Sequence, residues 1–185
     1  MLIILGGLPG VGKTSIAREL ATQLGAVHIR IDSIEDAIRQ SGVKVVSIDD
    51  AGYRVGYALA EDNLRLGHMV IADSVNPLSI TRDAWFDAAK RAGVECLEVE
   101  IVCNDAIEHR RRVEERTLNS SGLKPPTWMD VLSREYEPWV RDRLTIDTSS
   151  VPIDEATTKI VNAVAFTRDA RPISLELVKY DTRND

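Results

Sequence analysis

The chain is poor in cysteine: among its 185 residues there are two, Cys96 and Cys103. Two cysteines cannot build the disulfide framework of a small secreted domain, and these two lack the spacing of a metal-ligand cluster. We therefore expect both to be buried thiols of a protein that works in the reducing cytoplasm.

Long apolar runs and a basic leader are missing too. No stretch approaches the ~20 residues of a membrane-spanning helix, and the N-terminus has no basic region followed by a cleavage site. The net charge of −6 disfavours a broad nucleic-acid surface. With 44% hydrophobic and 28% charged residues, the chain is typical of a soluble globular protein without affinity for membranes, either a monomer or a homodimer.

One short motif carries the strongest chemical signal. It has the form G-x-x-x-x-G-K-[ST], lies between an apolar run and a helical pattern, and reads Gly7-Leu8-Pro9-Gly10-Val11-Gly12-Lys13-Thr14. Such a phosphate-binding loop turns backbone N–H groups and a helix N-terminus toward phosphate oxygens. We expect residues 7–15, including Ser15, to bind ATP, with Lys13 on the β- and γ-phosphates and the Thr14 hydroxyl on Mg²⁺.

The rest of the chain alternates between strand and helix patterns. We expect strands over 2–6, 27–31, 68–72, 94–103 and 144–146, and helices over 13–24, 33–41, 49–66, 79–92, 104–118, 128–140 and 153–166. Alternation of this kind predicts an α/β three-layer sandwich: a five-stranded parallel sheet with helices on both faces. We assign 1–167 to one P-loop domain with a helical lid over roughly 110–138, and 168–185 to a tail that could add an edge strand.

Two aspartates directly follow predicted strands, where ligands bind in parallel sheets. Asp32 could accept the proton of an attacking hydroxyl, or it could cap the next helix. Asp73 could hold Mg²⁺, contact substrate, or complete a strand-terminal turn. We favour a catalytic role for Asp32 and a metal or substrate role for Asp73.

The helix over 104–118 is rich in arginine. Arg112 and Arg116 are four residues apart and share one face, from which they could close over a triphosphate. The alternative is a solvated charged face, because carboxylates for local ion pairs are near: Glu108, Glu114 and Glu115. The histidines have no metal-ligand spacing, and we expect structural or surface roles for them.

With these residues in place, roughly 1–150 resembles the small P-loop kinases that include polynucleotide 5′-hydroxyl kinases and chloramphenicol phosphotransferase. The resemblance rests on Ile31-Asp32-Ser33-Ile34, on Ala72-Asp73-Ser74-Val75-Asn76-Pro77 with Arg82 and Trp85, and on Arg112-x-x-x-Arg116. It implies phosphoryl transfer from ATP with Mg²⁺. It also implies that Asp147 and Thr148 lie near the adenine.

The segment after Asp32 departs from the polynucleotide kinases, which carry a basic substrate contact there. Here that segment contains Glu35 and Asp36, which disfavours a nucleic-acid acceptor. We expect the acceptor pocket to use Asp32, Arg39, Tyr53, Tyr57, Asp73, Asn76 and Arg82, with Arg54 and Asn63 as further polar candidates.

The leading hypothesis is therefore a kinase that phosphorylates a hydroxyl of a small molecule, with Asp32 as general base. A polynucleotide 5′-hydroxyl kinase is the second hypothesis, and a regulatory switch that hydrolyses ATP slowly is the third. A GTPase is disfavoured because the chain has no N-K-x-D segment.

Overall fold

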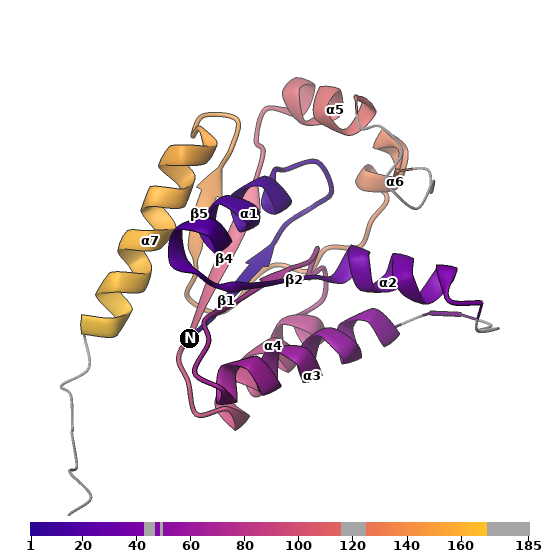
Figure 1. Ribbon diagram of the computed structural model, residues 1–185. Helices are drawn as coiled ribbons and strands as arrows, with labels where there is room; N and C mark the ends of the chain where they lie inside the picture. Colours follow the sequence, from indigo (N-terminus) through magenta and orange to yellow (C-terminus); the bar gives the residue numbers. More distant parts are fainter. Residues whose placement is uncertain (43–46, 49, 116–124, 170–185) are drawn as a thin grey trace, which may run out of the picture.

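The computed structural model describes residues 1–42, 47–48, 50–115 and 125–169 (Figure 1). Arg116 and the tail segment that could add a strand lie outside these residues. The strands are β1 Leu2–Gly6, β2 Val27–Arg30, β3 Val70–Asp73, β4 Cys96–Val102 and β5 Leu144–Asp147. The helices are α1 Lys13–Leu24, α2 Ile31–Gln40, α3 Ala51–Arg65, α4 Ser79–Arg91, α5 Ala106–Glu114, α6 Trp128–Leu132 and α7 Ile153–Asp169.

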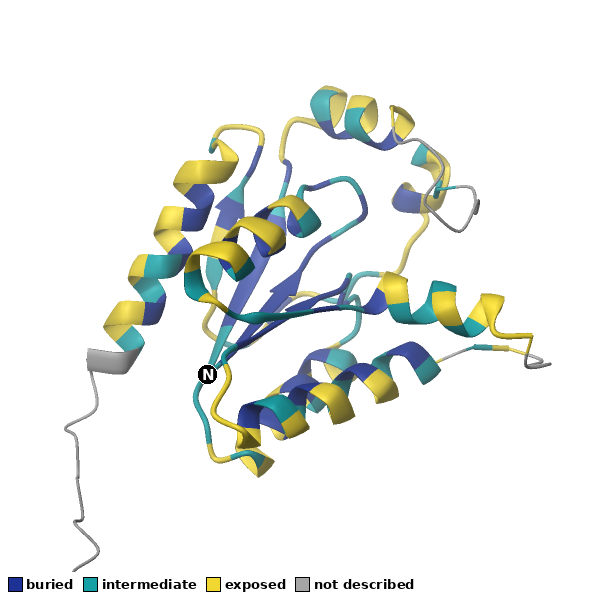
Figure 2. Ribbon diagram, in the orientation of Figure 1, coloured by how far each residue is buried: buried dark blue, intermediate teal, exposed yellow. Residues whose placement is uncertain are grey.

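The five strands form one parallel sheet in the order β2-β3-β1-β4-β5. The central strand β1 is buried along its whole length and alternates between two cores. Ile3 and Leu5 face the core beneath α1 and α7, whereas Leu2 and Ile4 face the core beneath α3 and α4. Figure 2 shows the buried strands between helices whose outer faces are exposed. The predicted three-layer α/β fold is confirmed.

The register of the sheet brings the candidate site together. Leu5, two residues before the glycine-rich loop, pairs with Asp73 at the end of β3, and Arg30 at the end of β2 pairs with Asp73 as well. Because parallel strands end at the same edge, the loop, Asp73 and the start of α2 meet there. Helices α5 and α6 contact each other and lie beyond one end of the sheet (Figure 1).

Two local predictions are wrong. The helix expected over 128–140 ends at Leu132 with Ser133 as its C-cap, and the chain beyond it is irregular, so that Trp139 packs against Gly6. Pro138 lies in this irregular part, where its missing N–H breaks no helical hydrogen bond. Helix α2 begins at Ile31 with Arg30 as its extended N-cap residue, so Asp32 lies in the first turn and is not the cap. Within the described residues no helix is both long and apolar enough to cross a bilayer.

Candidate functional site

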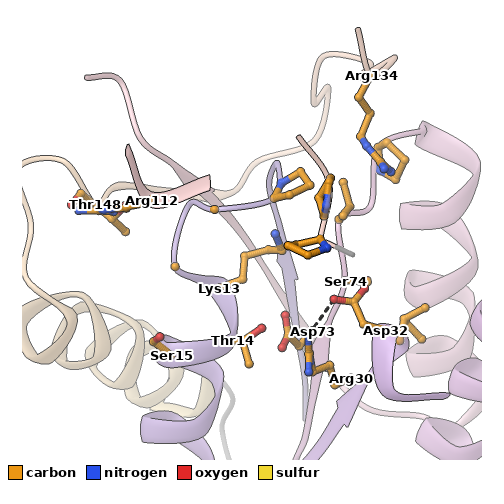
Figure 3. Close-up of a pocket in the computed structure, with 18 of the residues that line it drawn as sticks. Lys13, Thr14, Ser15, Arg30, Asp32, Asp73, Ser74, Arg112, Arg134 and Thr148 are labelled. Carbon is orange, nitrogen blue, oxygen red and sulfur yellow. Dashed lines mark hydrogen bonds and ion pairs between the residues drawn. The ribbon is translucent and has the colours of Figure 1, made fainter. Parts of the chain in front are cut away.

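A cavity of about 1200 Å³ opens at the carboxyl edge of the sheet (Figure 3). Among the described residues, its walls come from the glycine-rich loop and the start of α1, the β2–α2 junction with helix α2, Tyr53 of α3, the end of β3 and the residues after it, helix α5, residues 125–134, and the loop after β5. A cavity of this size can hold a nucleotide together with a small second molecule.

The glycine-rich loop is shaped for an anion. Gly7, Gly10 and Gly12 have φ of 141°, 90° and 96°, the backbone region that side chains disfavour. A Cβ atom on Gly7 would collide with the carbonyl oxygen of Ile101, so the loop keeps its path only with glycine there. Helix α1 begins directly after Gly12 without a side-chain cap, which leaves its first N–H groups free of side-chain acceptors. The loop therefore fits a chain of phosphates.

Lys13 lies inside this loop. Its side chain is 8% exposed, and Nζ donates hydrogen bonds to the carbonyl oxygens of Gly7 at 2.7 Å and Leu8 at 2.9 Å. These contacts hold the ammonium group above the strand-to-helix turn, where Figure 3 shows it reaching across the cavity. A charge in this position can neutralise phosphate oxygens bound by the loop amides.

Asp73 ends β3 beneath the loop and is 3% exposed. Burial alone raises its pKa, but the hydrogen bond with His28 at 3.2 Å, the charge of Lys13 and the hydroxyl of Thr14 outweigh burial and hold the pKa of Asp73 below its ordinary value. The carboxylate is therefore ionised and adjacent to Thr14. These two oxygen donors suit Mg²⁺, which takes one or two protein ligands together with substrate phosphates. No group of three His, Cys, Asp or Glu side chains among the described residues could hold a metal by itself.

The lowered pKa of Asp73 makes a prediction about stability and pH. A carboxylate with a depressed folded-state pKa stabilises the fold above its unfolded pKa of about 3.9, and this contribution is lost as the pH falls through the folded value. We expect the unfolding free energy of the wild type to exceed that of Asp73→Asn most at neutral pH, and the gap to narrow below about pH 4. Urea unfolding of both proteins between pH 7 and pH 3 measures this difference in unfolding free energy.

The control is Asp87→Asn, which replaces an exposed carboxylate on α4 and should follow the wild type at every pH. A gap between the wild type and Asp73→Asn that keeps the same size from pH 7 to pH 3 would contradict the role assigned to the Asp73 charge.

Asp32 faces the cavity from the first turn of α2. Its side chain is 54% exposed, and Oδ2 accepts a hydrogen bond from Nη2 of Arg30 at 2.9 Å. This contact leaves the carboxylate at the cavity wall with its other oxygen free of hydrogen bonds to the described residues. A carboxylate oriented in this way can accept a proton from a bound hydroxyl.

Helix α5 is docked onto the phosphate loop by two contacts. The guanidinium of Arg112 donates to the hydroxyl and to the carbonyl oxygen of Thr148, each at 2.9 Å, and the Thr148 hydroxyl contacts the carbonyl of Val11. The Nε2 atom of buried His109 lies 2.8 Å from the carbonyl oxygen of Pro9. Helix α5 is thereby connected both to the loop after β5 and to the phosphate loop.

Most of the predicted site residues line the cavity. They are Pro9, Gly10, Gly12, Lys13, Thr14, Ser15, Asp32, Arg39, Tyr53, Asp73, Arg112 and Thr148. Gly7, Leu8 and Val11 form the rest of the loop without lining it, and Asp147 lies behind Thr148, where it accepts hydrogen bonds from the N–H groups of Asn104 and Ser149. Arg116 lies outside the described residues.

Three residues that were predicted to contact the acceptor do not line the cavity, and each makes contacts elsewhere in the fold. Tyr57 donates a hydrogen bond to the Thr81 carbonyl oxygen. Buried Asn76 bridges Leu5 and Trp85, donating to the first and accepting from the indole of the second. The guanidinium of Arg82 is 4.8 Å from the Trp139 ring centroid and donates to the Glu137 carbonyl oxygen. Each side chain is used in packing behind the site.

Arg54 and Asn63 also lie away from the cavity. Arg54 pairs with Asp50, and Asn63 donates to the carbonyl oxygen of Leu59 one turn earlier in α3. The structure adds cavity residues that the sequence did not single out, above all Arg30, Ser74 and Arg134. A signal existed for two of them, because Arg30 and Ser74 flank Asp32 and Asp73 at the strand ends. Arg134 carried no signal, because it was placed in the middle of a predicted helix.

A comparison with protein families matches residues 2–138 to the AAA domain. The chain belongs to the AAA domain family. The match runs from β1 to Pro138 and includes the phosphate loop, Asp32, Asp73 and helix α5. The part of the cavity wall formed by Thr148 lies beyond it.

Two relatives are proteins from Pyrococcus furiosus and Pyrococcus abyssi, both provisionally named adenylate kinase. The first is 29% identical over 142 residues, covering 68% of this chain and 78% of that protein, and the second is 32% identical over 139 residues, covering 65% and 77%. These names support kinase chemistry in general. The resemblance to polynucleotide kinases and chloramphenicol phosphotransferase is thus supported only as far as a P-loop kinase.

Solved kinase structures share the fold. An APS kinase of Mycobacterium tuberculosis in complex with AMPPNP and APS superposes with a TM-score of 0.63 at 19% identity, covering 89% of this chain and 96% of that one. A gluconokinase of Sinorhizobium meliloti gives a TM-score of 0.56 at 18% identity, with coverages of 89% and 95%. The chain is a P-loop protein with a kinase-like fold.

Proposed function

We propose that this protein is an ATP-dependent phosphotransferase that moves the γ-phosphoryl group to a hydroxyl of a small molecule. The observation that supports the proposal most is that one cavity contains both a phosphate-binding loop with its lysine and, on a different element, a carboxylate able to act as a base: Lys13 and Asp32. A switch that only binds and slowly hydrolyses nucleotide does not need a second carboxylate-bearing region beside the phosphate loop.

In the proposed mechanism the loop amides and Lys13 bind the phosphates, and Thr14 and Asp73 would hold Mg²⁺, which would neutralise charge on the phosphates. Arg112, fixed to Thr148, lies on the nucleotide side of the cavity. Asp32 accepts the proton of the acceptor hydroxyl as its oxygen attacks the γ-phosphorus and ADP leaves. Positioning and charge neutralisation, rather than covalent chemistry by the protein, account for most of the expected acceleration.

The experiment that tests the proposal is ATP turnover with Mg²⁺ against a panel of acceptors. We expect a small alcohol to stimulate ADP formation and to become phosphorylated on its hydroxyl, with the product identified by ³¹P NMR. Stimulation by 5′-hydroxyl oligonucleotides alone would favour the polynucleotide kinase, and slow hydrolysis that no acceptor stimulates would favour the switch.

The panel includes AMP because of the names of the Pyrococcus relatives. Formation of ADP from AMP would show that the acceptor oxygen belongs to a phosphate, which needs no general base at neutral pH. That outcome would overturn both the hydroxyl acceptor and the role proposed for Asp32.

A further inference from the structure

The cavity has two ends that can be told apart. Figure 3 shows Arg112 and Thr148 at one end, Asp32, Ser74 and Arg134 at the other, and Lys13 between them. We refer to the end with Asp32, Ser74 and Arg134 as the acceptor end. If phosphates occupy the loop and the nucleotide extends toward Arg112, then the acceptor end is the space left for the second substrate.

The carboxylates of helix α2 near the acceptor end already have cationic partners within the protein. Asp32 pairs with Arg30 at 2.9 Å, and Arg39 pairs with both Glu35 at 3.1 Å and Asp36 at 3.3 Å. An acceptor that carried an amine would have to compete with these arginines for each of these carboxylates. The paired state of the α2 acids therefore disfavours a cationic group of the acceptor against this wall.

Arg134 is the opposite case. Its guanidinium lines the cavity from the turn after α6 but makes no hydrogen bond or ion pair with any residue that the structure describes. The carboxylate one turn earlier, Asp130, accepts from the backbone N–H and the hydroxyl of Thr127 in the capping box of α6. Arg134 is thus a cation with its full fork of donors available at the acceptor end.

One further donor near this end lacks an acceptor. Within the described part of the chain, the Nε of Arg30 is buried without a hydrogen bond. Arg30 lines the cavity, as does Ser74, which is 3% exposed and whose hydroxyl lies beside that of Tyr53. Because buried donors are normally satisfied, an unsatisfied donor at a cavity wall points to a ligand that supplies acceptor atoms.

We propose that the acceptor is a small alcohol that also carries an anionic group, a phosphate, sulfate or carboxylate, and that Arg134 binds this group. The inference rests on the proposed function and narrows its substrate class. Arginine is suited to the task because its planar guanidinium binds two oxygens of one anion at once. Binding the anion at Arg134 leaves the hydroxyl of the same molecule to reach Asp32.

A binding experiment tests the anion site without knowledge of the acceptor. The protein is saturated with AMPPNP and Mg²⁺, so that the phosphate loop is occupied, and inorganic sulfate is titrated by calorimetry. We expect one sulfate to bind, and Arg134→Ala to weaken it about 10- to 100-fold while the affinity for AMPPNP changes less than about twofold. Arg134→Lys should keep part of the affinity. Arg110→Ala, on the exposed face of α5 outside the cavity lining, is the control and should bind sulfate normally.

Three results would overturn the proposal: no sulfate binding to the AMPPNP complex, sulfate binding that Arg134→Ala leaves unchanged, or a loss of AMPPNP affinity in that variant. The last would mean that Arg134 contacts the nucleotide and not the acceptor. Circular dichroism of Arg134→Ala confirms that the variant is folded before its affinities are compared.

A kinetic experiment separates this proposal from the proposed function. Acceptors are compared in matched sets such as glucose, glucose 6-phosphate, gluconate and glucosamine, alongside other alcohols and a 5′-hydroxyl oligonucleotide. We expect stimulation by an anionic member, and Arg134→Ala to raise its KM about 10-fold or more with kcat within about threefold. Stimulation only by neutral, amine-bearing or oligonucleotide acceptors overturns the anionic small molecule but leaves phosphoryl transfer in place. No stimulation by any class overturns both proposals.

Discussion

Replacing Lys13 by alanine is expected to lower kcat for ATP-dependent transfer by at least about 10³-fold, since single preorganised charge contacts in such sites contribute on that scale. The side chain is nearly buried and is held by two loop carbonyls directly above the turn that would bind the phosphates. No other lysine lines the cavity within the described residues, so no neighbouring ammonium group can replace it. Steady-state kinetics with the best acceptor of the panel measure the effect.

The control for Lys13→Ala is Lys159→Ala, which removes an exposed lysine paired with Glu155 on α7. It should leave kcat within about twofold of the wild type, as expected for a surface ion pair. Circular dichroism and the midpoint of urea unfolding establish that both variants are folded. A folded Lys13→Ala protein with unchanged turnover would remove the assignment of the glycine-rich loop as the phosphate site.

Replacing Asp32 by asparagine is expected to lower kcat by about 10²- to 10⁴-fold, the usual contribution of a general base. Asparagine preserves the size of the side chain and a hydrogen-bonding oxygen toward Arg30 but cannot accept the proton. Because Asp32 lies at the acceptor end and not in the phosphate loop, KM for ATP should change less than about threefold. Measuring kcat and both KM values distinguishes these effects.

Asp62→Asn is the matched control, because Asp62 is an exposed carboxylate on α3 outside the cavity lining, and its kcat should not change. A carboxylate in the first turn also favours a helix, by about 0.3–1 kcal/mol. If Asp32→Asn lowered only the unfolding free energy by that amount and left kcat intact, Asp32 would serve helix α2 and not the reaction.

Much of the fold could be predicted from local sequence preferences. A buried strand, a glycine-rich turn and the start of a helix are determined by neighbouring residues, so β1, the loop and α1 were expected at the positions where they occur. Strand-helix alternation with right-handed crossovers leaves few alternatives to a parallel sheet. The places of Asp32 and Asp73 follow from the same rule, because Asp73 ends β3 and Asp32 lies in the first turn of the helix that follows β2.

The residues that line the acceptor end were less predictable. Helix periodicity does not tell whether a polar side chain points into the cavity or into the packing between elements. Asn76 and Arg82 follow β3 just as Asp73 ends it, yet both turn back into the packing around Trp85 and Trp139. The irregular segment after α6 decides this. It brings Trp139 against Gly6, which covers Arg82 and closes that side of the sheet.

By itself, therefore, the sequence determined the sheet, the phosphate loop and the two aspartates, because each depends on residues adjacent in the chain. Only the tertiary structure decided which distant side chains meet them. It placed Thr148 beside Arg112, brought half-buried His28 into hydrogen-bond contact with Asp73, and turned Arg134 into the cavity from a segment predicted to be a helix. The first two contacts join residues 36 and 45 positions apart, and such distances are bridged by the packing of layers and not by local backbone preference.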